Sequence, residues 1–418
     1  ENNNNVLPTF HALPSFSLTG SFMSDDFYTF MDDNEGQVLN SDRMDLAVGR
    51  IVADNASLMN AMVDKIIAFH DRDKFGRWRN SFTLLSDDVD LNWEGIIQES
   101  LDILGNEIST NKPFINVTKL HSDAFLQELV AGGERYPAVN EAINNAMEVG
   151  TVVLNYFGHG GESGLAAERL ISQGDAIGFR NDFIQPVFVT VTCEYTRFDN
   201  PLRPTAGEFT FWNTKAGAVG LITTTRQVFV QFGLTFNLTL QNYLFSFGSN
   251  DFPTLGESLM LAKNSFNNNQ KRVVFLVGDP AMTLPVPKPN IRLTQINDQP
   301  VNLQAMDTIK ALGKVKMAGE VTDENGGLLN DFNGTVFVTI YDKNLQRQTL
   351  ANDGTRNVFN QIIRLDFETL GEIIYRGKAS VQNGLFNFEF RAPRDIRVPV
   401  GNGRSSFYAE KTGSFEDR

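Results

Sequence analysis

Apolar residues follow two different patterns along this chain, and the change between them divides the sequence. From about residue 76 to residue 287, short runs that are apolar at nearly every position alternate with amphipathic segments. From about residue 290 onward, single apolar and polar residues alternate in short stretches separated by turn residues. Continuous apolar runs indicate strands that are buried on both faces, whereas strict alternation indicates strands with one buried face.

The first pattern predicts a mostly parallel sheet that is covered by helices on both sides. Strands are expected at residues 81–85, 117–120, 151–157, 187–192, 218–223 and 272–277, and helices at residues 93–104, 137–147 and 255–264. The preceding residues, up to about 75, mix loops with one helix after the capping residues 54–57, and residues 45–52 indicate a buried strand that Gly49 interrupts.

The second pattern predicts a small antiparallel β-sandwich. Its strands are expected at residues 315–321, 335–341, 378–381 and 386–390. Three prolines, Pro285, Pro287 and Pro289, form the linker before it. The chain is therefore expected to hold an α/β unit followed by a β-sandwich.

Composition excludes several classes of function. The chain has 36 Lys and Arg against 50 Asp and Glu, so its net charge is 36 − 50 = −14, which disfavours nucleic acid and bare anionic lipid as partners. Cys193 is the single cysteine, which excludes an intrachain disulfide and any CxxC metal or redox site. No apolar run is long enough to span a bilayer and no secretory leader opens the chain, and both ends are expected to be cuts inside a longer polypeptide.

One of the four histidines occupies a position suited to chemistry. His159 directly follows the apolar run at residues 151–157 and lies among glycines, whereas His11, His70 and His121 have no evident partner. Ligands bind at the carboxyl ends of the strands in open parallel sheets. The alternative is a glycine-rich turn that happens to contain a histidine.

Cys193 occupies the matching position after the next strand. It ends the apolar run at residues 187–192 and lies 193 − 159 = 34 residues after His159, which leaves room for one crossover helix. A nearby imidazole can take the thiol proton and create a strong nucleophile, and the backbone amides of Gly160 and Cys193 are candidate donors to the oxyanion. The acyl group would then pass to water or to an amine. The alternative is that Cys193 is a buried small apolar residue.

The order of these motifs resembles the caspase-like cysteine peptidases and, more closely, the gingipain family. Further segments that look like that family are VGRI at 48–51, RWRNSFTLLSDD at 77–88, NYFGHGG at 155–161 and VGDPAM at 277–282. The resemblance implies a caspase-haemoglobinase-like sheet followed by an immunoglobulin-like domain. It divides the chain into the remainder of a first subdomain (1–75), a catalytic subdomain (76–287) and an immunoglobulin-like sandwich (288–418) that is expected to be truncated.

The same resemblance implies roles for individual residues. Cys193 would be the nucleophile, His159 the general base and Gly160 the oxyanion donor. An acidic residue would orient the histidine from the loop after residues 82–85. The candidates in that loop are Asp87, Asp88, Asp90 and Glu94, of which Asp88 and Asp90 are favoured.

Substrate and metal binding are open to more than one interpretation. Arg226 and Glu194 are candidates for binding substrate, although a structural role for Arg226 is an equal alternative. Residues 88–92 have the acidic spacing of a calcium loop, with Glu99 at the twelfth position, but Trp93 replaces the required glycine. The resemblance implies structural calcium without any required cofactor, whereas the residues themselves favour solvated carboxylates and no metal site.

Within the family, TCEYTRFDNP at 192–201 and TTTR at 223–226 look like the sortases of type IX secretion. This implies removal of a C-terminal secretion domain from exported proteins and transfer of the new C-terminus to an anionic lipopolysaccharide. The implied partner is an outer-membrane barrel protein, and the implied location is the surface of a Gram-negative bacterium. The alternatives are a secreted endopeptidase that only hydrolyses, and an inactive fragment that acts as a binding module.

Overall fold

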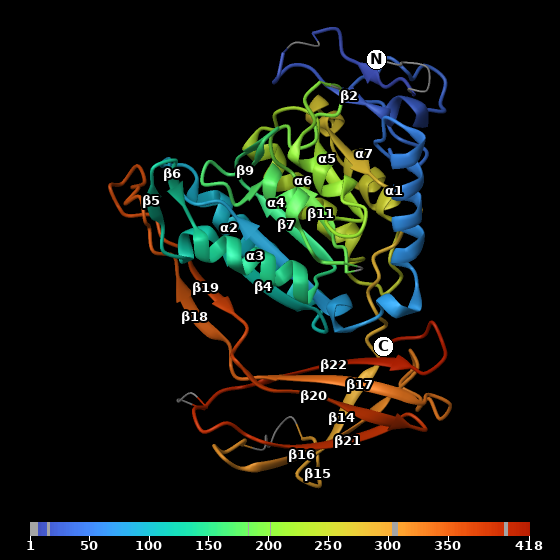
Figure 1. Cartoon of the computed structure of the whole chain (residues 1–418), viewed down its shortest axis with the longest axis vertical. Helices are drawn as coiled ribbons and strands as arrows, with labels where there is room; N and C mark the ends of the chain where they lie inside the picture. Colours follow the sequence, from blue (N-terminus) through green and yellow to red (C-terminus); the bar gives the residue numbers. More distant parts are fainter. Residues whose placement is uncertain (1–6, 15–16, 183, 201, 303–307, 397–399) are drawn as a thin grey trace.

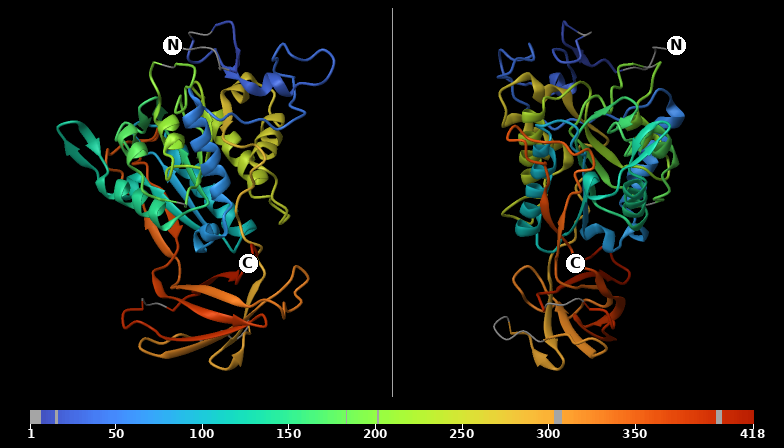
Figure 2. Two further views of the ribbon diagram at one scale, coloured as in Figure 1. Left: turned by 45° about the vertical axis from the view of Figure 1, so that its right-hand side comes forward. Right: turned by 90° about the vertical axis from the view of Figure 1, so that its left-hand side faces the viewer.

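The computed structural model describes residues 7–14, 17–182, 184–200, 202–302, 308–396 and 400–418. These residues form two parts stacked along the long axis of the molecule, an α/β part and a β part (Figure 1). The views in Figure 2 show the same stacking from two further directions, with the α-helices confined to the α/β part.

A six-stranded sheet forms the centre of the α/β part. Its strand order is β13-β12-β11-β7-β3-β4, and all neighbouring pairs are parallel except β12 with β13. The strands are β3 (Ser81–Ser86), β4 (Asn116–His121), β7 (Val153–Phe157), β11 (Val187–Thr190), β12 (Gly220–Thr224) and β13 (Val274–Val277). Nearly every position in these strands is buried, as their continuous apolar sequences predict.

Helices cover both faces of this sheet. Buried residues of α2 (Gly95–Asn111), α6 (Val230–Leu244) and α7 (Leu255–Asn264) belong to one hydrophobic cluster. Those of α3 (Pro137–Val149), α4 (Gln173–Gly178) and α5 (Ala206–Trp212) belong to a second cluster, and α1 (Ala56–Phe69) contributes to both. Alternate residues of β11 face the two clusters, with Val187 and Val189 in the first and Phe188 in the second. The sheet is therefore the middle of three layers.

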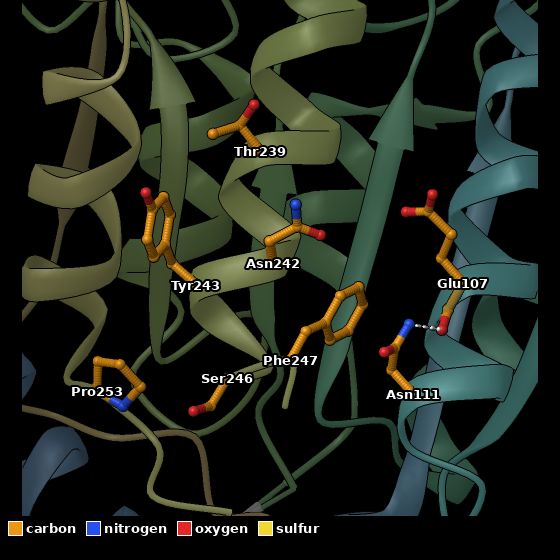
Figure 3. A pocket seen from close by; sticks show the side chains of 8 residues that line it. All are labelled: Glu107, Asn111, Thr239, Asn242, Tyr243, Ser246, Phe247 and Pro253. Atoms are coloured by element: carbon orange, nitrogen blue, oxygen red, sulfur yellow. Dashed lines mark hydrogen bonds between the residues drawn. The ribbon is translucent and has the colours of Figure 1, made fainter. Parts of the chain in front are cut away.

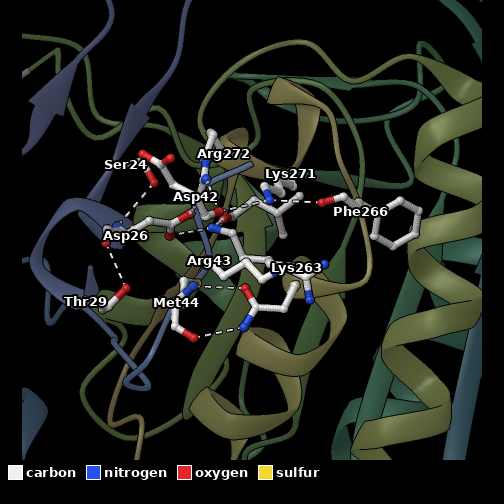
Figure 4. Close-up of polar contacts among 12 residues, drawn as sticks. Ser24, Asp26, Thr29, Asp42, Arg43, Met44, Lys263, Phe266, Lys271 and Arg272 are labelled. Atoms are coloured by element: carbon white, nitrogen blue, oxygen red, sulfur yellow. Dashed lines mark hydrogen bonds and ion pairs between the residues drawn. The ribbon is translucent and has the colours of Figure 1, made fainter. Parts of the chain in front are cut away.

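A buried ion network attaches the N-terminal segment to this core. Asp26 lies in the 3-10 helix η2 (Asp25–Thr29), and its carboxylate bonds Lys263 at 2.5 Å and Arg272 at 2.9 Å (Figure 4). All three side chains are at most 3% exposed. Phe22 and Val38 lie in the same hydrophobic cluster as the first face of the sheet, so this segment shares the core of the α/β part.

The β part is a curved seven-stranded antiparallel sheet with the order β15-β14-β16-β21-β20-β17-β22. The sheet has one buried face and one exposed face, as the alternation of apolar and polar residues predicts. In one strand, Phe386, Phe388 and Phe390 are buried while the residues between them are exposed. The strands are β14 (Ile291–Ile296), β15 (Gln299–Pro300), β16 (Lys314–Val321), β17 (Gly334–Tyr341), β20 (Ile373–Gln382), β21 (Leu385–Arg391) and β22 (Arg404–Lys411).

A long excursion from the β part reaches back to the α/β part, and we call it the arm (residues 345–369). It begins with β18 (Leu345–Gln348), ends with β19 (Asp366–Thr369), and rises beside β4 in Figure 1. The Asn352 amide donates to the Asp123 carboxylate at 2.9 Å, and the Phe367 ring packs against His121. The arm therefore joins the two parts through polar and aromatic contacts.

The remaining strands and 3-10 helices are short. They are β1 (Phe10–His11), β2 (Met23–Ser24), β5 (Glu128–Val130), β6 (Gly133–Arg135), β8 (Gly160–Gly161), β9 (Gly164–Leu165), β10 (Ile171–Ser172), η3 (Arg72–Lys74), η4 (Arg77–Asn80), η5 (Ser122–Ala124) and η6 (Asn269–Val273). Among the described residues, none of the helices has the length and apolar character needed to cross a bilayer.

The predicted layout is confirmed, with particular exceptions. Each strand predicted in the sheet is present, and the helix at 255–264 has the predicted bounds. Residues 45–52 were expected to form a strand, but they make only an isolated bridge between Arg50 and Val277. The sequence did not predict α5, α6 or the arm. In α6 the apolar residues alternate with polar ones or glycine from Val230 to Leu240, which is the pattern of a strand and not of a helix.

Replacing Asp26 with Asn should lower the free energy of unfolding by about 3–5 kcal/mol, because two buried cations would lose their shared counterion. Denaturant unfolding followed by tryptophan fluorescence measures this loss. Asp33→Asn, at an exposed position nearby, is the matched control and should change the free energy by less than about 0.5 kcal/mol. Equal losses in the two variants would contradict the role of the network.

Candidate active site

The register of two parallel strands brings His159 and Cys193 to one edge of the sheet. β7 and β11 are neighbours, and Tyr156 and Thr190 form their last paired position. His159 lies 159 − 156 = 3 residues beyond that pair, and Cys193 lies 193 − 190 = 3 residues beyond it. The two segments therefore leave the same carboxyl edge at the same level, where open sheets bind their ligands.

These two segments are also bonded to each other. The Thr192 hydroxyl donates to the Gly158 carbonyl at 2.5 Å, and each of these residues directly precedes one of the candidate catalytic residues. A Cβ atom at Gly160 would lie 2.7 Å from the Thr192 side chain, which is closer than packing allows. The absence of a side chain at Gly160 thus allows the histidine segment to lie this close to Thr192.

The His159 imidazole is held by a buried carboxylate. Its Nε2 atom lies 2.8 Å from Glu94 Oε1, and the Trp93 ring meets it edge-on at a centroid distance of 6.1 Å. The His159 side chain is 52% exposed, whereas that of Glu94 is 2% exposed. The histidine therefore faces solvent while its partner lies inside the protein.

Glu94 is fixed by the loop that precedes α2. Its second oxygen, Oε2, accepts the backbone N–H groups of Asp90 at 2.9 Å and Leu91 at 2.7 Å. A carboxylate with one oxygen bound in this way accepts a hydrogen bond from the histidine at the other, so Nε2 carries the hydrogen and Nδ1 has a free lone pair. When the imidazole is neutral, this geometry favours the tautomer that carries its hydrogen on Nε2.

Asp87 and Tyr156 hold the backbone of the histidine loop. Asp87 Oδ2 accepts the His159 N–H at 2.7 Å, and the Tyr156 hydroxyl donates to the His159 carbonyl at 2.5 Å. A Cβ atom at Gly158 would lie 2.4 Å from Asp87 Cβ, so the loop passes against this side chain. Both the N–H and the carbonyl of His159 are thus hydrogen-bonded. These bonds hold in place the backbone from which the imidazole extends.

Cys193 is partly buried at the end of the second segment. Its Sγ atom lies 3.9 Å from the Val228 carbonyl. Burial raises the pKa of the Cys193 thiol above its usual value, the Val228 backbone acts in the opposite direction, and the Glu194 carboxyl adds to the rise. The resting thiol is therefore neutral at pH 7, and it needs a base to become a nucleophile.

Among the acidic candidates, the structure selects Glu94 and corrects the preference for Asp88 or Asp90. Asp88 is buried and accepts the Tyr136 hydroxyl at 2.8 Å, while Asp90 is exposed and gives its backbone N–H to Glu94. An acidic residue at the start of a helix is usually explained by the helix dipole. The sequence therefore contained no signal that separated Glu94 from the other candidates.

Arg226 does not line an open cleft, which corrects its assignment to substrate binding. Its guanidinium group is 1% exposed, pairs with Asp199 at 2.5 Å and donates to Ser21. Glu194 has a backbone φ of 54° and a side-chain oxygen, Oε1, that is buried without a hydrogen-bond partner among the described residues. Glu194 thus keeps an acceptor available beside Cys193.

A cavity of about 600 Å³ lies elsewhere, between the C-terminal halves of α2 and α6 (Figure 3). Glu107 and Asn111 line one side, and Tyr243 and Phe247 line the other. Glu107 follows Glu94 by 107 − 94 = 13 residues, which corresponds to ~20 Å along the helix. The cavity is therefore separate from the candidate active site.

Comparison with known proteins connects this site to a family. The sequence model described as Peptidase family C25 matches residues 1–285. A search of curated proteins found no match.

Several solved structures are similar to this chain. The crystal structure of the Arg-specific cysteine proteinase gingipain R (RgpB) has a TM-score of 0.51 at 14% identity, covering 90% of this chain and 73% of its own. The complex of Porphyromonas gingivalis RgpB pro- and mature domains has a TM-score of 0.50 at 14% identity, covering 90% and 75%. Dimeric latent PorU from Porphyromonas gingivalis has 21% identity and a TM-score of 0.34, covering 98% of this chain and 32% of its own.

The likeness to RgpB confirms the gingipain-like fold that the sequence predicted. The division at residues 75 and 287 and the immunoglobulin-like character of the β part stay predictions. The identities are too low to transfer a substrate, so the function depends on the site itself.

Alkylation of Cys193 by iodoacetamide should be slow at pH 7 in the native chain and should rise steeply toward pH 9. Because the pKa of the thiol is raised, the thiolate appears at a higher pH in the folded chain than in the unfolded one. The urea-unfolded chain, whose thiol has a pKa of about 8.5, is the control. Fast labelling that is independent of pH from 6 upward would contradict this and would indicate a resting thiolate.

Proposed function

This chain belongs to peptidase family C25, and from that premise we propose that Cys193 is the nucleophile and His159 the general base of a cysteine peptidase. The observation that carries this proposal is the placement of both residues three positions beyond one pair of parallel strands, with His159 bonded to a buried glutamate. Covalent catalysis by a thiol uses a nucleophile, a base and an orienting carboxylate, and Cys193, His159 and Glu94 are the residues we propose for these roles.

The first half of the reaction forms a thioester. His159 Nδ1 takes the proton of Cys193, and the thiolate sulfur bonds the carbonyl carbon of the substrate. The carbonyl oxygen becomes an oxyanion, for which the backbone N–H groups of Gly160 and Cys193 are the proposed donors. The C–N bond then breaks, and the imidazolium returns its proton to the departing amine. Glu94 stabilises the imidazolium while it exists.

The second half releases the acyl group. His159 takes a proton from water or from an incoming amine, and that nucleophile displaces the sulfur, which recovers the proton. Water gives a free carboxyl group, and an amine gives a new amide bond. The Oε1 atom of Glu194, which has no partner among the described residues, offers an acceptor for an amine at this step.

In its finer form, the proposed function is that of a sortase. TCEYTRFDNP and TTTR resemble PorU more than the secreted gingipains, although Pro201 lies outside the described residues. The proposed substrates are exported proteins with a C-terminal secretion domain, and the proposed acceptor is an anionic lipopolysaccharide. The proposed setting is the surface of a Gram-negative bacterium beside an outer-membrane barrel protein. Two alternatives remain open to test: an endopeptidase that only hydrolyses, and an inactive binding module.

Replacing His159 with Ala should lower the turnover of a peptide substrate by roughly 10²–10⁴-fold, because the general base is lost. Glu94→Gln should give a smaller loss, since the imidazole keeps its place but loses the charge that stabilises its protonated form. Asp90→Asn is the matched control, because its backbone N–H still binds Glu94. Single-turnover kinetics on purified variants measure these effects, and a variant Asp90→Asn as slow as Glu94→Gln would contradict the assignment.

Incubation with a tagged exported protein and an amine nucleophile should produce an amine adduct at a new C-terminus, detected by mass spectrometry. Cys193→Ala should produce neither cleavage nor adduct. Cleavage without an adduct would favour the hydrolytic endopeptidase over the sortase. The absence of cleavage in the unmodified chain, together with unreactive Cys193, would favour the binding module.

A further inference from the structure

Two hairpins of this chain expose large apolar side chains to solvent. One is formed by β5 and β6, where Leu129 is 82% exposed. The other is the tip of the arm, which an isolated bridge between Arg356 and Ile362 closes and where Val358 and Phe359 are 79% and 80% exposed. Large apolar side chains that gather at a protein surface mark a place where another molecule binds.

The two hairpins are joined at their bases. The Asn352 side chain of the arm donates to the Phe125 carbonyl at 2.9 Å, and its oxygen accepts the Gln127 N–H at 3.3 Å. Both of these partners lie just before β5, and Figure 1 shows the two hairpins on the β4 side of the central sheet. The exposed side chains of both hairpins are therefore held at one end of the sheet.

A third segment links the hairpins to the candidate active site. Leu91 and Trp93 are exposed in the loop before α2, and the Trp93 ring meets the His159 ring edge-on. The arm is fastened to the same loop, because the Thr355 hydroxyl donates to the Asp90 carbonyl at 3.3 Å. The exposed apolar side chains on the three segments, which we call the apolar rim, are Leu91, Trp93, Leu129, Val358 and Phe359.

The hairpin of β5 and β6 gains little stability from its own side chains. All three residues of β5 are exposed, as are the first two of the three residues of β6. A two-stranded hairpin with its side chains in solvent is only marginally stable. A partner that covers the apolar rim would therefore add the apolar burial that this hairpin lacks.

The chemistry proposed for the site decides which part of a substrate lies beside the apolar rim. The departing amine takes its proton from His159, so the polypeptide that follows the scissile bond begins at this histidine. The strand order β11-β7-β3-β4 places Cys193 first, His159 next and the arm beyond them at β4. A chain that leaves His159 in the direction away from Cys193 therefore meets the apolar rim.

We propose that the apolar rim binds the departing part of a polypeptide substrate, as an extended segment with apolar side chains on the C-terminal side of the scissile bond. This inference rests on the proposed function, which supplies the order of thiol, imidazole and departing amine. Neighbouring strands are ~4.8 Å apart, so β4 lies ~10 Å from β7, and an extended chain covers that distance in about three residues. Contacts with the rim therefore begin about three residues after the scissile bond.

Two peptide substrates that share the residues before the scissile bond test this inference. One ends two residues after the bond, and the other continues for roughly ten residues in which Leu and Phe alternate with Ser. The unmodified chain should cleave the longer peptide with a kcat/KM at least tenfold higher. Phe359→Ser should lose most of this difference and should cleave the shorter peptide like the unmodified chain. Val400→Ser, at an exposed apolar position before β22, is the matched control and should keep the difference.

Binding without turnover separates this inference from the proposed function. In a Cys193→Ala chain, fluorescence anisotropy compares the labelled apolar segment of the longer peptide with a segment that has Ser at every apolar position. The apolar segment should bind at least tenfold more tightly, and Leu129→Ser or Phe359→Ser should weaken its binding at least threefold. That result, in a chain whose Cys193 form cleaves neither substrate, would support the rim and contradict the proposed chemistry.

Three outcomes would overturn the inference. The first is equal binding of the two segments, or equal kcat/KM for the two substrates. The second is a loss of binding in Val400→Ser as large as that in Phe359→Ser. The third is a dimer of the unmodified chain that Phe359→Ser converts to a monomer in analytical ultracentrifugation while peptide binding stays unchanged, which would assign the rim to a second copy of this chain.

Discussion

The parallel pairing of β7 with β11 is the constraint on which the candidate active site depends. Parallel strands end at the same edge of a sheet, and their register decides which residues beyond that edge lie at the same level. His159 and Cys193 are each three residues past the pair formed by Tyr156 and Thr190. A shift of one residue in this pairing would move His159 away from the level of Cys193, so the buried apolar contacts that fix the register also fix the relative placement of these two residues.

Buried carboxylates then give the histidine its orientation. Glu94 binds the imidazole, and Asp87 binds the backbone of the same residue. Both acids are enclosed, and their geometry is set by backbone N–H groups as well as by the histidine itself. Enclosed acids are effective at this task because their bonds are stronger in a low dielectric, but they accumulate negative charge under a single loop. Asp87 has two further acids beside it, because its carboxyl oxygen lies within 4.8 Å of those of Asp88 and Glu168.

The β part is more than an appended domain, since its arm reaches the loop that holds Glu94. Thr355 donates to the Asp90 carbonyl, and Asn352 binds Asp123 and the Phe125 carbonyl. Asp90 in turn provides one of the N–H groups that fix Glu94. The Thr355 contact is thus linked to His159 through Asp90 and Glu94, and both parts of the molecule contribute to the position of this histidine.

The sequence by itself determined the layers of the fold and the strand-end positions of the two candidate catalytic residues. Continuous apolar runs specify strands buried on both faces, and His159 and Cys193 each stand at the end of such a run, so strand periodicity alone predicted their common edge. Only the tertiary structure decided which acid orients the histidine and that Arg226 is buried against Asp199. Several acids follow β3 within eight residues, and their distances from His159 depend on how the loop before α2 folds. That path is set by backbone hydrogen bonds and by contacts with the distant arm, which leave no local pattern in the sequence.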